Sequence, residues 1–331
     1  MKIIRNGRRR DMKSIWYDRG LKLIDQTLLP EKLLVKRLDD ERGVAEAIRS
    51  MRVRGAPAIG VAGAYGVAIA AKKGRARSAA RLLKAARPTA VDLKNCVDEV
   101  LGEKSARSMM GKADEICERV VGACKKIGED GEKLIGKQAR ILTHCNAGAL
   151  ATVDWGTALA PIRVAQRKGK KPFVFVDETR PRLQGALTSW ELLNEGIRHR
   201  VIVDNARGYF MRRGEIDSVI VGADRVVVNE GCIVNKIGTY GAAVIAKENN
   251  IPFYVAAPLT TFDWTSGKSD VKIEERSERE VLGIDVNGRG FPKKAKAFNP
   301  AFDITPAKYI TRIICEKGVY KPEDLRMILS D

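Results

Sequence analysis

The sequence predicts an α/β protein with a C-terminal, Rossmann-like, doubly wound parallel sheet and a smaller, mainly helical N-terminal domain that carries a few short strands. After about residue 131, short apolar runs that end in polar or turn residues alternate with helical patterns, which is typical of parallel strands joined by crossover helices. Before that point, apolar residues recur mostly at helical spacing. A chain of 331 residues, 44% of them hydrophobic, is too long to fold around one hydrophobic core of ordinary size, so we expect two domains. We place the boundary in the polar, glycine-rich segment 128–136, giving domains 1–130 and 131–331.

The N-terminal domain is expected to begin with a small sheet. Its short apolar stretches lie between turn signals, at residues 14–16, 20–24 and 33–35. From Asp39 the apolar side chains of Val44, Ala45, Ile48 and Met51 share one helical face. That helix should end before the loop at residues 54–57, because glycine and proline interrupt helices.

A run of small and apolar residues follows at 58–71, with Gly60, Gly63 and Gly66 at threefold spacing. It lacks the GxG element and a preceding strand, so it is not a dinucleotide-binding loop. We interpret it as a buried helix whose glycines allow close packing. A long helix is then expected over residues 91–126, with Cys117 and Cys124 together in its core-facing side.

The C-terminal domain should contain five parallel strands. They are predicted at residues 140–143, 173–176, 201–203, 219–221 and 253–256. Polar or turn residues follow each of them, namely Cys145–Asn146, Asp177–Glu178, Asp204–Asn205, Asp224–Arg225 and Pro258. Helices are expected at 189–196 and 242–248, and a loop followed by a helix at 299–310. The strand tips should lie along one edge of the sheet, where ligands bind in such folds.

The stretch at residues 217–241 combines several groups suited to an anion. Asp224 follows a buried strand, and Asn235 and Lys236 precede Gly238, where a helix should start with free amide groups. Helix starts of that kind bind phosphates. The combination suggests a small anionic substrate, while the alternative is that Asp224 only caps a loop.

Cys145 lies where a strand is expected to turn into a helix. A helix amino end favours the thiolate form, which makes a cysteine reactive, although a buried inert cysteine is the commoner case. A thiol and a carboxyl such as Asp224 in one cleft can divide acid and base roles.

Other side chains are candidates for substrate contacts. Arg54, Arg87 and Lys236 suit phosphate oxygens, or are surface cations. Gln184 offers a donor and an acceptor to a sugar hydroxyl, or is a structural amide. Asp204 is a further carboxylate at a strand tip, to which we assign no role.

The charge and the cysteine content limit which binding partners and which cellular compartment we expect. The net charge of +19 is spread along the chain, which indicates a solvated basic surface, and nucleic acid is an unlikely partner even with the basic segment 7–13. Six cysteines without metal spacing, and only His144 and His199 beside them, argue against a metal site. No apolar run reaches ~18 residues and no signal peptide is evident, so we expect a cytoplasmic, reduced protein that does not bind a membrane.

Seven motifs together resemble the methylthioribose-1-phosphate isomerase family. They are RGAPAIG (54–60), RPTAV (87–91), THCNAGALAT (143–152), ETRPRLQGA (178–186), GADR (222–225), NKIGTY (235–240) and NPAFDITPA (299–307). They occur in order along nearly the whole chain. The superfamily also includes ribose-1,5-bisphosphate isomerase and the regulatory subunits of eukaryotic translation initiation factor 2B. The forms around Cys145 and Gln184 are more similar to those of the methylthioribose enzymes.

The resemblance implies an aldose-ketose isomerase of methionine salvage that acts on a sugar phosphate as a homodimer, without cofactor or metal. It implies that Cys145 and Asp224 are the catalytic pair. Asp224 would be the general acid for ring opening, and Cys145 would assist hydrogen transfer from C2 to C1, through an enolate or by supporting a hydride shift. It further implies that substrate is bound by Arg54, Gly55, Ala56, Arg87, Gln184, Asn235 and Lys236.

Two alternatives stay open. A ribose-1,5-bisphosphate isomerase would need a second cationic pocket where the methylthio group would otherwise lie against apolar side chains. A regulatory subunit similar to those of initiation factor 2B would have no need of both Cys145 and Asp224.

Overall fold

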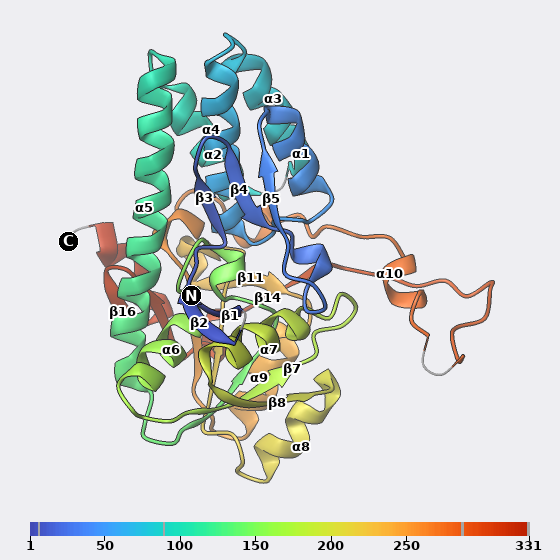
Figure 1. Cartoon of the computed structure of the whole chain (residues 1–331). Coiled ribbons are helices and arrows are strands. Elements are labelled where there is room, and N and C mark those ends of the chain that lie inside the picture. Colours follow the sequence, from blue (N-terminus) through green and yellow to red (C-terminus); the bar gives the residue numbers. More distant parts are fainter. Residues whose placement is uncertain (6, 89, 286–287, 330–331) are drawn as a thin grey trace.

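The computed structural model describes residues 1–5, 7–88, 90–285 and 288–329, and in it the chain forms two lobes (Figure 1). Thr89, within the second motif, lies outside the described residues. One lobe contains helices α1 to α5 and a three-stranded sheet. The other is built on a seven-stranded sheet. The predicted α/β class with a helical N-terminal part is confirmed.

The α-helices of the described chain are α1 Glu41–Arg49, α2 Ala56–Ala71, α3 Ala76–Ala86, α4 Val91–Leu101, α5 Ala106–Gly131, α6 Leu159–Arg167, α7 Gln184–Glu195, α8 Arg207–Arg212, α9 Thr239–Glu248 and α10 Arg279–Leu282. Within the ranges that the structure describes, none of these helices combines the length and the apolar character needed to cross a bilayer.

The strands are β1 Lys2–Arg5, β2 Arg8–Asp11, β3 Ile15–Tyr17, β4 Leu21–Ile24, β5 Val35–Leu38, β6 Arg140–Thr143, β7 Phe173–Asp177, β8 Arg198–Ile202, β9 Ser218–Val221, β10 Arg225–Val227, β11 Cys232–Lys236, β12 Phe253–Ala256, β13 Phe262–Asp263, β14 Phe302–Thr305, β15 Arg312–Cys315 and β16 Gly318–Tyr320. Strands β3, β4 and β5 form the predicted small N-terminal sheet.

The large sheet has the strand order of a Rossmann fold. Its order is β16-β15-β12-β9-β6-β7-β8, and all neighbours are parallel except β15 and β16. Read from β8 to β15, the parallel strands come third, second, first, fourth, fifth and sixth along the chain. The order reverses between β6 and β9, and ligands bind at such a switch point in open α/β sheets.

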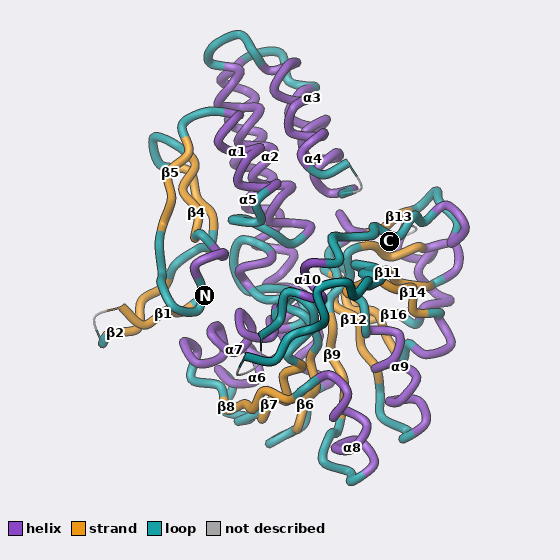
Figure 2. Tube along the Cα trace, turned by 90° about the vertical axis from the view of Figure 1, so that its right-hand side faces the viewer, coloured by secondary structure: helices purple, strands orange, loops and turns teal. Residues whose placement is uncertain are grey.

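Helices cover both faces of this sheet (Figure 2). Ile141 of β6 and Ile220 of β9 pack with α6 and α7, whereas Leu142 and Val219 pack with α8 and α9. Because successive side chains point to opposite faces, burial on both sides requires the continuous apolar runs that identified these strands.

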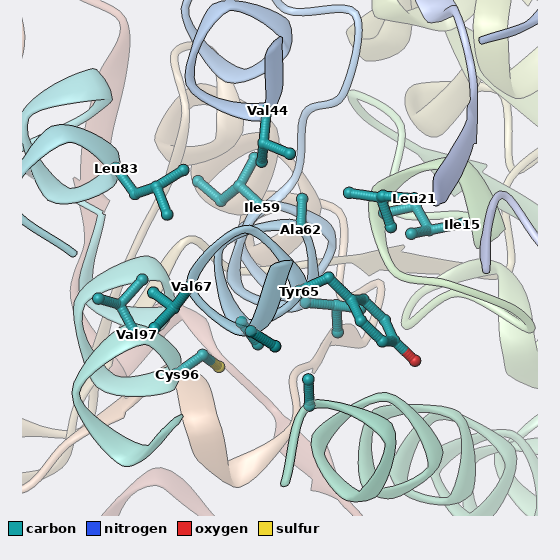
Figure 3. Close-up of a cluster of buried hydrophobic side chains, with 14 of the residues drawn as sticks. Ile15, Leu21, Val44, Ile59, Ala62, Tyr65, Val67, Leu83, Cys96 and Val97 are labelled. Carbon is teal, nitrogen blue, oxygen red and sulfur yellow. The ribbon is translucent and has the colours of Figure 1, made fainter. Parts of the chain in front are cut away.

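The N-terminal lobe is organised around α2. Fourteen of its residues are buried, and side chains from the small sheet, α1, α3 and α4 surround it (Figure 3). A Cβ atom on Gly63 would lie 2.4 Å from Leu93 Cδ1, and one on Gly66 would lie 2.9 Å from Leu83 Cδ1. The glycines therefore allow the neighbouring helices to approach closely, as predicted.

The prediction of a single helix over residues 91–126 is wrong, because one helix ends at Leu101 and the next begins at Ala106. Ser105 caps α5 by accepting a hydrogen bond from the Ser108 amide at 3.1 Å, and the Ser108 hydroxyl accepts one from the Ser105 amide. This reciprocal cap starts a new helix. Cys117 and Cys124 are buried core residues of α5, and all six cysteines are free thiols.

Three further expectations need correction. Residues 299–310 contain strand β14, because residues 302–305 pair with β11, and only a short 3₁₀ turn follows. The strand expected at 201–203 is β8, Arg198–Ile202, an edge strand whose solvent face carries arginines that interrupt the apolar run. Met51, expected on the first helix, lies beyond its end with a positive φ of 58°.

Helix α5 runs along both lobes in Figure 1. Its last turns contact α6, where Gly128 meets Ala160 and Gly131 meets Pro161. The segment expected to be a linker is therefore helical as far as Gly131. At the other end of the chain, the β1–β2 hairpin packs on α7, and the Ile4 amide donates to Asn194 at 2.6 Å.

Candidate active site

One pocket of about 690 Å³, including the open space at its mouth, lies at the carboxyl ends of β6 and β9, where the N-terminal lobe meets the sheet. All nine residues proposed from the sequence line it, namely Arg54, Gly55, Ala56, Arg87, Cys145, Gln184, Asp224, Asn235 and Lys236. These residues come from six separate segments of the chain, and the fold brings them together.

Cys145 and Asp224 lie at the switch point of the sheet. They follow β6 and β9, which are neighbours in the sheet with Leu142 opposite Val219. Gly222 allows this approach, since a Cβ atom there would lie 2.8 Å from the Ala147 methyl group. The thiol and the carboxyl therefore face one pocket although 79 positions separate them in the sequence.

The environment of Cys145 differs from the expected helix amino end. The chain after it is a loop, followed by a three-residue 3₁₀ turn, and the next α-helix begins at Leu159. Burial raises the pKa of the Cys145 thiol, against the opposing effects of Arg54 and Lys236. The expectation that a helix dipole favours the thiolate is therefore wrong, and the thiol is protonated at neutral pH.

Hydrogen bonds hold the backbone of Cys145 in an uncommon conformation. Its φ is 67°, which a non-glycine residue adopts only when its surroundings impose it. The Thr179 hydroxyl accepts from the Cys145 amide at 2.8 Å, and the Thr188 hydroxyl donates to the Cys145 carbonyl at 2.8 Å. Both peptide groups of the residue are thus fixed from the side of β7 and α7.

The amino end of α2 opens into the pocket. Gly55 precedes the helix with φ 96°, and among the described residues no side chain caps it. A Cβ atom on Gly55 would lie 2.3 Å from the Ala151 carbonyl oxygen, so only glycine fits between the two lobes there. Arg54 donates to the Asn146 carbonyl at 3.0 Å and also to its side-chain oxygen. Free helix amides beside a guanidinium form an anion-binding site.

The amino end of α9, in contrast, is already occupied. The Asp303 carboxylate accepts hydrogen bonds from the Gly238 amide at 2.7 Å and the Tyr240 amide at 3.1 Å. The sequence had suggested that these amides are free for a phosphate. That expectation is wrong, because β14 delivers a carboxylate to them.

Asn235 and Lys236 reach the pocket from β11, part of a second sheet with the order β13-β10-β11-β14 that begins directly after Asp224. Lys236 Nζ donates to the Ala301 carbonyl at 2.7 Å and lies 4.6 Å from the centre of the Phe302 ring. Burial lowers the pKa of Lys236, while Cys145 and Asp224 raise it.

Gln184 and Arg54 each present an atom without a partner. Gln184 Oε1 and Arg54 Nε are buried and have no hydrogen bond within the part of the chain that the structure describes. A buried polar atom that lacks a partner is unfavourable. An acceptor and a donor in one pocket are therefore available to the hydroxyl and phosphate groups of a ligand.

Sequence reasoning missed several pocket residues, above all Arg276. Its side chain is 8% exposed, pairs with Glu274 at 3.0 Å and lies near the Phe302 ring. It belongs to the long segment that projects with α10 in Figure 1. Neither a strand tip nor a helix start marks it, so the sequence held no local signal.

One cluster near the pocket has the composition of a metal site. His144, Asp177 and Asp204 bring ligand atoms within 4.8 Å of one another. However, both ring nitrogens of His144 already have partners, Asp177 at 2.9 Å and the Ile237 carbonyl at 2.8 Å. The Arg207 guanidinium lies 3.2 Å from Asp177 and supplies positive charge there. The cluster is therefore an internal ion-pair network.

Fold and pocket together define an α/β protein with a pocket at the switch point of a doubly wound sheet, lined by several cations, a thiol and a carboxyl. The chain belongs to the Initiation factor 2 subunit family, whose sequence profile matches residues 52–322.

Named relatives fall into two groups. The methylthioribose-1-phosphate isomerase of Acetivibrio thermocellus is 48% identical, over 95% of this chain and 98% of its own. The 5-methylthioribose 1-phosphate isomerase of Pyrococcus horikoshii superposes with a TM-score of 0.89 at 37% identity, covering 97% and 96% of the two chains. A structure titled translation initiation factor eIF-2B, subunit delta, from A. fulgidus has a TM-score of 0.86 at 43% identity, covering 97% and 100%.

Proposed function

We propose that this protein is an aldose-ketose isomerase that converts 5-methylthioribose 1-phosphate to 5-methylthioribulose 1-phosphate in methionine salvage. The observation that carries the proposal is the shared pocket of Cys145 and Asp224 beside the open amino end of α2. The names of the relatives from A. thermocellus and P. horikoshii support the same reaction.

The substrate phosphate is assigned to the amino end of α2. The backbone at Gly55 and Ala56 and the side chain of Arg54 surround this position, and Arg87 and Lys236 line the same pocket. Arginine forks and helix amides are both suited to phosphate oxygens. With Arg276, four cations line the pocket, and against the carboxylate of Asp224 they leave an excess of positive charge for a phosphate dianion.

The phosphate on the anomeric oxygen prevents the sugar from opening to a free aldehyde. In the proposed reaction Asp224 donates a proton to the ring oxygen as the bond between C1 and that oxygen breaks. Hydrogen then moves with its electron pair from C2 to C1, and the C2 hydroxyl proton returns to Asp224. Atoms and charge balance without an added oxidant or base. General acid catalysis of this kind contributes about 10²–10⁴-fold in rate.

The protonated state of Cys145 favours the hydride shift over an enolate. Because burial raises the pKa of this thiol, little thiolate is present at neutral pH to take a proton from C2, and a bound phosphate dianion would raise this pKa further. We therefore assign Cys145 to the wall of the pocket beside C2, where an uncharged side chain keeps water away from the migrating hydrogen.

The pocket continues into an annex suited to the methylthio group. Its apolar lining consists of Ile59, Ala90, Val91, Val234, Val271 and Phe302. The cations Arg87, Arg225 and Lys272 also line the annex, together with the carboxylates of Asp224 and Glu274. A second phosphate dianion would meet this mixed charge, whereas a thioether would bury apolar surface.

A direct assay tests the proposal. The purified protein is incubated separately with methylthioribose 1-phosphate and ribose 1,5-bisphosphate, and ketose formation is followed. We expect turnover of the first and at least about a hundredfold lower kcat/KM for the second. If ribose 1,5-bisphosphate were turned over faster, it would replace methylthioribose 1-phosphate as the assigned substrate. No turnover of either would favour a role as an initiation-factor subunit, the name given to the relative from A. fulgidus.

The proposal includes a cytoplasmic homodimer without nucleic acid as a partner. Six free thiols suit a reducing compartment. The dimer rests on the family resemblance alone, and light scattering of the purified protein would test it.

A further inference from the structure

Glu191 of α7 is a buried carboxylate that binds the loop after Cys145. Its side chain is fully buried, and it accepts hydrogen bonds from the Ala149 amide at 2.8 Å and the Leu150 amide at 3.2 Å. Gly148 allows this contact, since a Cβ atom there would lie 2.3 Å from the carboxylate oxygens. The loop is thus folded around this side chain.

The same carboxylate fixes the orientation of the Asn146 amide. Asn146 Nδ2 donates to Glu191 Oε1 at 2.9 Å and to the Thr188 hydroxyl at 3.1 Å. An ionised carboxylate can only accept, so the nitrogen of the amide must face Glu191 and the oxygen must face the other way. The Glu191 carboxylate therefore sets the orientation of the Asn146 amide.

The Asn146 oxygen faces Arg54. One terminal nitrogen of the guanidinium donates to this oxygen, and the other donates to the Asn146 carbonyl at 3.0 Å. A guanidinium held by both terminal nitrogens retains its Nε edge for another acceptor. Arg54 Nε is buried and has no hydrogen-bond partner among the described residues. The edge that remains is the one available for a phosphate.

Arg163 compensates the charge of Glu191. It is 1% exposed, and its guanidinium contacts the Glu191 carboxylate, the Trp155 carbonyl and, at 3.2 Å, the Glu195 carboxylate. Glu195 lies one helical turn from Glu191 on α7 and pairs with the same arginine. Its other partners among the described residues are Arg167 and the Lys2 amide, and not the loop that follows Cys145. The chain therefore provides a matched control.

We propose that Glu191 is a positioning residue for phosphate binding, which acts through Asn146 to hold Arg54 with its Nε edge toward the substrate. This inference rests on the proposed function in one respect, the assignment of Arg54 to the substrate phosphate. Glu191 itself contacts no substrate.

Binding of inorganic phosphate, measured by calorimetry, tests the inference without the isomerase reaction. Glu191→Gln should weaken phosphate binding at least about tenfold, because a glutamine can turn a donor toward Asn146 and the loop amides. Glu195→Gln should keep phosphate affinity within about twofold while lowering the melting temperature. Equal affinities in the Glu191 variant and the unmodified protein, or an equal loss in both variants, would overturn the proposal.

A second variant removes the risk that Glu191→Gln does not fold. Asn146→Ala leaves Glu191 paired with Arg163 and the loop amides, and should weaken phosphate binding about as much as Glu191→Gln. Unchanged phosphate affinity in Asn146→Ala would refute the link to Arg54.

A double-mutant cycle isolates the pathway. In an Arg54→Lys background, Glu191→Gln should change phosphate affinity less than about twofold, because the group it positions is gone. If Glu191→Gln lowered phosphate affinity by the same factor with and without Arg54→Lys, Glu191 would act by another route. If the unmodified protein does not bind phosphate, the assignment of Arg54 fails and the inference with it. Glu191-dependent phosphate binding without isomerase turnover would refute only the proposed reaction.

Discussion

Replacing Gly55 by alanine should separate the two halves of the pocket. A Cβ atom at this position would lie 2.3 Å from the Ala151 carbonyl oxygen and 2.5 Å from the Ala151 Cα. Ordinary contacts begin at 3.4 Å, so the backbone must move by 3.4 minus 2.3, about 1.1 Å. Both neighbours are backbone atoms and no side chain can rotate away.

Two costs follow for Gly55→Ala. The φ of 96° with ψ of 137° is a glycine conformation, and holding alanine there costs about 1–3 kcal/mol. Overpacking adds about 1–3 kcal/mol. A shift of about 1 Å between Arg54 and the loop of Cys145 should lower kcat/KM about a hundredfold, since misplacement on that scale has such effects.

The matched control is Gly74→Ala, just beyond the other end of α2. Gly74 also has a positive φ, 69°, but an added Cβ would meet nothing within 4 Å. It should lose about 1–2 kcal/mol of stability and keep kcat/KM within about twofold. Steady-state kinetics and thermal unfolding of both variants are the assay. The reasoning would be refuted if Gly55→Ala had the kcat/KM of the unmodified protein, or if Gly74→Ala lost as much kcat/KM as Gly55→Ala.

Further predictions concern the pocket and its surroundings. Asp224→Asn should lower kcat at least about a hundredfold with unchanged circular dichroism, because the general acid is lost, and near-normal turnover would remove Asp224 from the mechanism. Cys145→Ser places a water-binding hydroxyl beside C2 and should lower kcat about tenfold or more, and near-normal turnover would contradict the role assigned to the thiol. Because burial raises its pKa, Cys145 should react with iodoacetamide slowly at neutral pH and faster only above pH 9, with further slowing by phosphate; rapid labelling at pH 7 would contradict this. Arg276→Ala should raise KM about tenfold, as expected for a lost charge-assisted hydrogen bond, and an unchanged KM would place it outside substrate contact. Burial raises the pKa of Asp92 to about 6. Between about pH 4 and 6 the folded protein therefore keeps a proton on Asp92 that the unfolded chain loses. The free energy of unfolding should fall by about 3 kcal/mol as the pH rises through this range. Asp92→Asn should therefore raise the melting temperature at pH 8 and not at pH 4.

Sequence patterns located β6, β7, β9 and β12 of the large sheet well because these strands are buried on both faces, whereas β15 and β16 were not predicted. Residues 140–143 and 253–256 were predicted with the bounds that the structure shows. Strands β10 and β11 escaped notice, because three to five residues around a tight turn are too few for a clear period. The loop and helix expected over residues 299–310 were not found, because residues 302–305 pair with β11.

The candidate site was predictable as far as it consists of strand tips and motifs. Cys145 and Asp224 follow strands whose order in the sheet sets them side by side. The same reasoning could not foresee Asp303 at the amino end of α9, since that contact depends on long-range pairing. Arg276 could not be found either, because an irregular segment places it.

The strand order also has a consequence for synthesis of the chain. Strands β6 and β9 touch in the finished sheet, yet β7 and β8 are made between them. A nascent chain that has emerged only as far as β8 already contains Cys145 but not Asp224, which faces it in the complete pocket. Catalytic competence should therefore arise abruptly, late in translation, so that truncated products released from the ribosome are inert.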